Sequence, residues 1–241
     1  MRTMVYPRLL RQLLDAVYPR ACVLCGASGA QGRDLCAACA AELPHVACAC
    51  SRCGRPLIRS GGNVCGRCLR KPPPYADVFA PLRYAEPVDR LIAEYKFRGR
   101  LTHAALFSAL LIEAAEASER RPPELLLPVP LHRSRLRERG YNQALELARP
   151  LARHWGVRVD AFALTRVRAT AAQMQLPAKQ RLKNVRGAFA LREGVRLPES
   201  VAVIDDVMTT GATVSEIAKL LRRAGVKRVE VWAVARAGVG R

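Results

Sequence analysis

One stretch of sequence decides the fold of most of this chain: Val201-Ala202-Val203-Ile204-Asp205-Asp206-Val207-Met208-Thr209-Thr210-Gly211-Ala212-Thr213. Its first four residues predict a buried strand, and the pattern from Val214 onward predicts a helix. Ligands of parallel α/β sheets bind beyond the carboxyl ends of the strands, where Asp205 and Asp206 are expected to lie. The turn Thr209–Thr213 then predicts an anion-binding nest of hydroxyl groups and helix N-terminal amides, which Gly211 lets a ligand approach closely.

The adjacent carboxylates Asp205 and Asp206 indicate a ligand of a particular kind. Two neighbouring negative charges repel each other unless they bind ribose hydroxyls, directly or through magnesium. The alternative is a helix N-cap followed by ordinary turn residues. A pair of acids followed by Thr-Thr-Gly-Ala-Thr is rare, which favours a binding site.

The segments before and after this stretch alternate between strand and helix patterns from residue 76 onward. Strands are predicted at 78–84, 125–130, within 157–167, at 201–204 and at 229–234, and helices near 87–97, 102–118, 141–154 and 214–224. This alternation predicts an α/β domain with a mostly parallel sheet and flanking helices.

The nine cysteines all lie between Cys22 and Cys68, and eight of them form four C-x-x-C pairs. Glycine follows two of the pairs, as in metal-binding knuckles. The spacing predicts two structural zinc sites filled in chain order, whose ligands would be Cys22, Cys25, Cys36 and Cys39, then Cys50, Cys53, Cys65 and Cys68. A secreted disulfide framework and an interleaved pairing of the cysteines are less favoured alternatives, and Cys48 is left without a role.

These patterns predict three parts: an amphipathic N-terminal helix in residues 1–20, a double zinc ribbon in 21–71, and the α/β domain in 72–241. The segment Lys71–Pro74 reads as a semi-rigid linker between the last two. The N-terminus lacks the features of a secretory signal, and no apolar run is long enough for a transmembrane segment, so a cytoplasmic protein is expected.

The chain carries 40 basic and 20 acidic residues, which gives a net charge of +20. Such a charge attracts polyanions, including nucleic acids. Codon bias could explain the preference for Arg over Lys, but not the excess of bases over acids. Aromatic residues make up only 5% of the chain. The clustered candidates for base stacking are therefore few, and core roles are the more common explanation for them: Tyr75, Phe79, Tyr84, Tyr95 and Phe97.

The loop Asp205–Thr213 resembles the signature of type I phosphoribosyltransferases, which bind phosphoribosyl pyrophosphate (PRPP) with magnesium. Beyond the loop, the whole chain resembles the competence protein F family. This resemblance rests on the cysteine pairs together with Tyr95–Gly99, Pro128–Leu131, Arg137–Gln143 and Asn184–Phe189.

The phosphoribosyltransferase resemblance implies roles for two further loops. Arg133 and Arg135 follow the first core strand and would approach the pyrophosphate, unless they form a solvated basic face. Arg166 and Arg168 begin a long loop that also contains Thr170, Gln173 and Arg181, and would stabilise its departing charge. His132 and Glu138 lie near the site, yet no residue stands out as a general base, and the acceptor is not identified.

The resemblance to competence protein F implies a PRPP-binding protein that binds single-stranded DNA and supports DNA uptake or internalisation, with proteins of the uptake machinery as partners. The alternative is a cytosolic phosphoribosyltransferase of nucleobase salvage. The two functions differ in an observable way. DNA binding predicts an affinity that falls steeply with salt, whereas salvage predicts base-dependent release of pyrophosphate.

Overall fold

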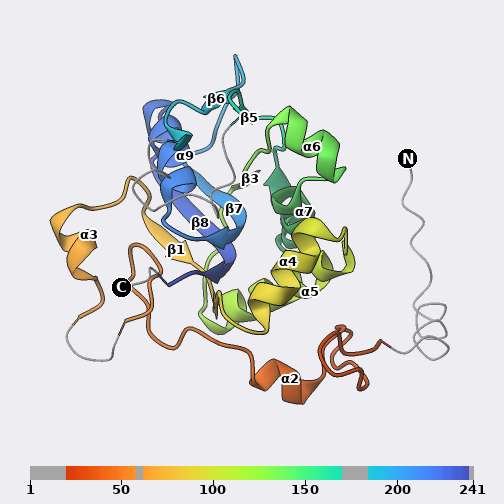
Figure 1. Cartoon of the computed structure of the whole chain (residues 1–241). Coiled ribbons are helices and arrows are strands. Elements are labelled where there is room, and N and C mark those ends of the chain that lie inside the picture. The colour runs from red at the N-terminus through yellow and green to blue at the C-terminus, as the bar shows by residue number, and fades with distance from the viewer. Residues whose placement is uncertain (1–19, 58–61, 170–183, 239–241) are drawn as a thin grey trace. The chain divides into compact units, whose positions relative to one another are not determined.

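A computed structural model describes residues 20–57, 62–169 and 184–238 (Figure 1). The chain divides into two compact units, residues 1–43 and 44–241, and each is described by itself. The first unit contains one cysteine cluster and the short helix α2 (Ala37–Ala41). The expected N-terminal helix precedes Arg20 and lies outside the described residues.

The second unit is built on a parallel sheet, which confirms the predicted α/β class. Its strands follow the order β1-β8-β7-β3-β4, and β2 also pairs with β8. Their bounds are β1 Asp77–Phe79, β2 Leu82–Arg83, β3 Leu125–Pro128, β4 Arg158–Val159, β7 Ser200–Met208 and β8 Arg228–Arg236. A separate antiparallel pair consists of β5 (Leu164–Arg166) and β6 (Phe189–Leu191).

Helices cover both faces of the parallel sheet (Figure 1). On one face, α9 (Ala212–Arg223) packs Val214 and Ile217 into a core that includes Val203. The helices on the other side of the sheet are α4 (Val88–Phe97), α5 (Thr102–Ala117) and α7 (Gln143–Trp155). There Trp155 meets Trp232 of β8 edge to face, with ring centroids 5.3 Å apart. No helix within the described residues is long and apolar enough to cross a membrane.

The structure differs from the sequence prediction in several elements, and the strand expected at 78–84 is two short strands, β1 and β2. Strand β7 continues through both aspartates to Met208, because Asp205 pairs with Ala233 and Met208 with Arg236 of β8. The strand expected within 157–167 is two strands, which belong to different sheets. A short helix, α6 (Arg133–Arg139), forms after β3, and Gly140 ends it in the left-handed conformation.

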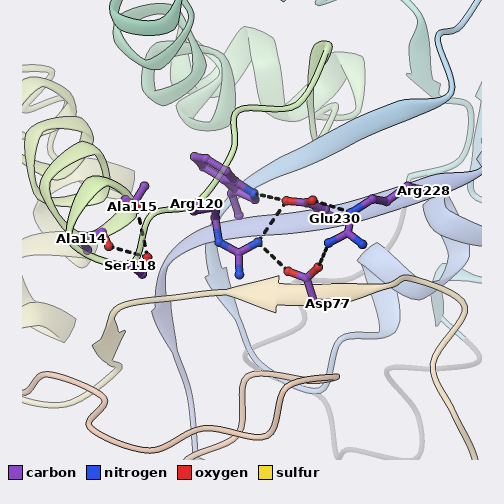
Figure 2. Close-up of polar contacts among 8 residues, drawn as sticks. Asp77, Ala114, Ala115, Ser118, Arg120, Arg228 and Glu230 are labelled. Carbon is purple, nitrogen blue, oxygen red and sulfur yellow. Dashed lines mark hydrogen bonds and ion pairs between the residues drawn. The ribbon is translucent and has the colours of Figure 1, made fainter.

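A polar network joins β1 to β8 at the ends of the strands where the chain enters them (Figure 2). The guanidinium of Arg120 donates to Asp77 (2.8 Å) and Glu230 (3.1 Å), and that of Arg228 donates to the same carboxylates (2.6 and 2.7 Å). The indole of Trp232 also donates to Glu230 (2.9 Å). All these charges are paired with one another, which indicates a structural role for the network.

Candidate functional site

A cavity of about 190 Å³ opens beside the carboxyl ends of β3 and β7. Its lining includes six of the predicted site residues, which are Asp205, Asp206, Thr209, Thr213, Arg135 and Arg166. The cavity therefore lies at the edge of the sheet where ligands of parallel α/β folds bind.

The other predicted residues of this region lie around the cavity rather than in its lining. Arg133 is an exposed residue at the start of α6. Arg168 donates to the carbonyls of Asn184 (3.0 Å) and Arg186 (2.7 Å), so it ties together two segments on either side of residues 170–183. Thr170, Gln173 and Arg181 fall outside the described residues.

Lys96 also lines the cavity, and sequence reasoning did not single it out as a site residue. Its ammonium group lies 2.7 Å from Asp206 Oδ1, and both side chains are largely buried. Burial acts to lower the pKa of Lys96, but the charges of Asp206 and Asp205 outweigh it and raise that pKa. The motif Tyr95–Gly99 had marked this segment only as part of a family pattern. One other sequence feature could have drawn attention to Lys96: lysine is rare in this chain, with 6 among 40 basic residues.

The two aspartates differ in environment although they are adjacent. Asp206 is ion-paired with Lys96, whereas burial and the charge of Asp206 raise the pKa of Asp205 to about 7. The pair therefore presents one carboxyl group held by Lys96 and one that takes up a proton near neutral pH. Such a pair can accept hydrogen bonds from sugar hydroxyls or coordinate a hard divalent cation.

The loop from Thr209 to Thr213 turns sharply between β7 and α9. Gly211 has a φ of +78°, and a Cβ there would lie 2.7 Å from Met208 Cε and 3.3 Å from the Tyr75 hydroxyl. Any other residue would be strained and would clash, so this turn requires glycine. Gly211 also occupies the N-cap of α9, where it offers no side chain to the helix amides, and the Thr210 hydroxyl accepts from the amide of Ala212 (3.3 Å).

The carbonyl groups at the start of this loop are held by Arg236, the last residue of β8. Its guanidinium donates to the carbonyls of Met208 (2.9 Å) and Thr209. It also donates to the carbonyl of Cys53 (2.9 Å), in the second cysteine cluster. The side chain is almost fully buried, at 1% exposure.

The run Arg139–Gln143 forms the opposite wall of the cavity. Asn142 caps α7 by accepting from Ala144 N (3.0 Å), and it donates to the carbonyl of Val129 (3.1 Å) after β3. Gln143 is 3% exposed and lines the cavity. Within the described part of the chain, its amide nitrogen is buried without a hydrogen-bond partner. Such a donor is costly to leave unpaired, so the site suits a ligand with an acceptor at this position.

The cysteines form two clusters of four, in the predicted chain order. In each cluster all four sulfur atoms lie within 4.8 Å of one another. The amides of Cys39 and Cys65 donate to the sulfurs of Cys36 (3.4 Å) and Cys50 (3.3 Å). Burial acts to raise the pKa of the Cys22 and Cys50 thiols, but backbone amides near each lower it to about 6.

Four thiolates at these spacings fit tetrahedral zinc and leave no position open for catalysis. The chain therefore has two four-cysteine zinc-binding sites, formed by Cys22, Cys25, Cys36 and Cys39 and by Cys50, Cys53, Cys65 and Cys68. Cys48 belongs to neither cluster. Its carbonyl accepts from the amide of Leu57 (3.0 Å), a contact beside the second cluster.

Comparison with known proteins agrees with the two cysteine clusters and identifies relatives of the whole chain. The double zinc ribbon domain family matches residues 13–69. The DNA utilization protein YhgH of Escherichia coli K12 is 38% identical over 90% of this chain and 97% of its own length. Competence protein F of Haemophilus influenzae is 37% identical over 78% of this chain and 84% of its own length. Competence protein ComFC of Streptococcus pneumoniae is 26% identical over 78% and 88%. On this similarity, the chain belongs to the family of competence protein F and the DNA utilization proteins.

Proposed function

We propose that the cavity binds PRPP with magnesium, and that the protein binds single-stranded DNA and supports its uptake or internalisation. The observation that carries the PRPP proposal is the position of Asp205 and Asp206 beside the Thr209–Thr213 loop, in one cavity. The loop offers amides and hydroxyls to the 5-phosphate, and the carboxylates face the ribose hydroxyls and the magnesium ion.

The other lining residues complete this assignment. Arg135 and Arg166 supply positive charge for the pyrophosphate, whereas the hydrogen bonds of Arg168 to carbonyl groups favour a supporting role for it. The unpaired amide of Gln143 offers a donor to a ligand oxygen. Ligand binding, rather than turnover, is the proposed activity.

Calorimetric titration of PRPP with magnesium into the zinc-loaded protein tests this proposal. We expect wild-type binding that is lost in Asp205→Asn/Asp206→Asn. Glu116→Gln, which removes an exposed carboxylate paired with His154, serves as the control and should bind as wild type does. Absence of binding by the folded wild type would contradict the proposal.

A basic groove supports the DNA part of the proposal. This groove, of about 480 Å³, is lined by Arg52 of the second zinc ribbon and by Lys219, Arg222, Arg223 and Lys227 at the end of α9, and no acidic residue is among its lining. All five cations are exposed, although Lys219 and Lys227 also pair with Glu216 and Glu199. Such a groove suits the phosphate backbone of a single strand.

Fluorescence anisotropy with a labelled single-stranded oligonucleotide tests the groove. In Arg52→Gln/Lys219→Gln/Arg223→Gln we expect weaker binding and a salt slope smaller by about three, roughly one per phosphate contact. The control Arg149→Gln/Arg153→Gln/Arg158→Gln removes the same charge from α7 and β4 and should change binding little. Equal losses in the two variants would mean that DNA is attracted by overall charge and not by this groove.

Nucleobase salvage is the second candidate, and the feature that favours it is Phe97. This ring is 63% exposed, lines the cavity and lies 5.3 Å from the guanidinium of Arg139. It could stack on a nucleobase beside the ribose site. Base-dependent release of pyrophosphate from PRPP, lost in Asp205→Asn/Asp206→Asn, would establish this activity.

The cytoplasm and the DNA-uptake machinery are the proposed location and partners.

A further inference from the structure

Arg236 links the second zinc ribbon to the phosphate loop through one buried guanidinium. Its Nε donates to the carbonyl of Cys53, while Nη1 donates to Met208 and Thr209. Cys53 is a predicted zinc ligand, and Thr209 lines the cavity. One planar side chain thus fixes the zinc knuckle and the start of the loop relative to each other.

The buried positive charge of Arg236 requires a negative charge nearby, and the second zinc ribbon can supply it. Within the described residues, all of its hydrogen bonds go to carbonyl oxygens, the fourth being Ala237 (2.7 Å), and no carboxylate there pairs with it directly. Four thiolates around one Zn²⁺ carry a net negative charge, and a zinc-loaded cluster therefore supplies the counter-charge that a buried guanidinium requires.

Two packing contacts join the same parts of the molecule. Gly54, next to Cys53, leaves no room for a side chain because its Cβ would lie 2.8 Å from Val78 of β1. Tyr75, which precedes β1, is buried, and its hydroxyl closes the space beside Gly211. The knuckle around Cys53, the edge strand β1 and the Thr209–Thr213 loop are therefore closely packed, so that a shift of one displaces the others.

We propose that Arg236 is a positioning residue through which zinc in the second cluster sets the geometry of the PRPP loop, so that zinc and PRPP bind cooperatively. This inference rests on the proposed function of the cavity. Coupling between two sites is reciprocal: if zinc strengthens PRPP binding, PRPP must strengthen zinc binding by the same factor.

The first experiment compares the two clusters by calorimetry with PRPP and magnesium. Cys65→Ser disrupts the second cluster, and the matched control Cys36→Ser disrupts the first, which belongs to the other compact unit. We expect PRPP affinity to fall at least tenfold in Cys65→Ser and to stay within twofold of wild type in Cys36→Ser. Equal affinity in both variants would overturn the proposal while leaving PRPP binding intact. No binding by wild type would instead contradict the proposed function.

The second experiment measures a property that a merely structural arginine would not change. In the Cys36→Ser protein, which keeps only the second cluster intact, zinc transfer to a chromogenic chelator is followed with and without PRPP. We expect PRPP to slow this transfer several-fold. Arg236→Gln should abolish the slowing, and Arg236→Lys, which keeps the charge and part of the hydrogen bonding, should restore some of it. Transfer that PRPP does not affect, in a protein shown to bind it, would overturn the coupling.

Discussion

At the scale of a single residue, Asp205 is a carboxyl group whose burial lowers the stability of the fold at neutral pH. Its pKa rises from 3.8 to about 7 on folding, because of burial and the neighbouring charge of Asp206. The folded protein thus holds this proton more tightly than the unfolded chain does. Stability should therefore be lost as the pH rises between these two values.

Replacing the Asp205 carboxyl group with a neutral amide removes this loss of stability at higher pH. We expect Asp205→Asn to raise the free energy of unfolding by roughly 1–2 kcal/mol at pH 8 and by clearly less at pH 5. Urea unfolding at the two pH values measures the difference, with the exposed Glu193→Gln as a control that should be neutral at both. A gain of the same size at pH 5 and pH 8 would show that the ionised carboxylate is not its source.

The residues of the site differ in how far they could be predicted. Asp205, Asp206 and Gly211 are evident from their neighbours in sequence, because strand, acids and turn are contiguous. Lys96 and Arg236 reach the same site from distant segments, and no local pattern links them to it. Arg236 looks like the charged end of an apolar strand, yet it is one of the most buried side chains in the described structure.

At the scale of elements, the network of Asp77, Arg120, Arg228 and Glu230 fixes the edge strand β1 to β8. Strand β1 has only three residues, so backbone pairing alone holds it weakly. Glu230 accepts from both arginines and from Trp232, and it is 6% exposed. Removing it leaves the buried indole N–H of Trp232 without its partner and breaks the contacts of both arginines to this carboxylate.

We expect Glu230→Ala to lower the free energy of unfolding by roughly 2–4 kcal/mol. The control is Glu199→Ala, which breaks the exposed pair with Lys227 and should cost less than about 1 kcal/mol. Chemical denaturation of both variants provides the comparison. Similar costs would mean that solvent weakens the Glu230 contacts as much as it weakens a surface pair.

Long amphipathic elements could be predicted from sequence, but short elements held by tertiary contacts could not. The helices α4 and α5 agree with their predicted ranges, because apolar residues recur on one face. Helix α6 has no buried residue, and β6 has three residues, so neither leaves a periodic pattern. Helix α6 contributes Arg135 and Arg139 to the cavity lining, where local sequence is adapted to the site rather than to the core.

At the scale of the whole molecule, the two compact units differ in what stabilises them. In residues 20–43 the buried side chains are Cys22, Leu35 and Leu43, a core too small to fold by apolar burial alone. The sheet of the second unit buries a large apolar core on α9 and its other helices. Zinc should therefore supply most of the folding free energy of residues 20–43.

Removal of zinc should accordingly unfold one part of the chain and spare another. With a strong chelator present, we expect amides of residues 20–43 to lose hydrogen-exchange protection while those of β3, β7 and β8 keep theirs. Exchange followed by mass spectrometry resolves the segments, and restoring zinc should restore protection. Continued protection of residues 20–43 without metal would show that the unit folds independently of it.

The pairing of β1 with β8 brings together positions 151 residues apart, such as Asp77 and Arg228. Such a high contact order makes folding slow, because the chain must close a long loop before these contacts form. During synthesis, the second ribbon and β1 leave the ribosome well before Arg236 does. The nascent chain can therefore bind zinc in the second cluster before the loop that this zinc is proposed to position has been translated. Strand β8 is translated later and carries Arg236, which joins the cluster to the loop.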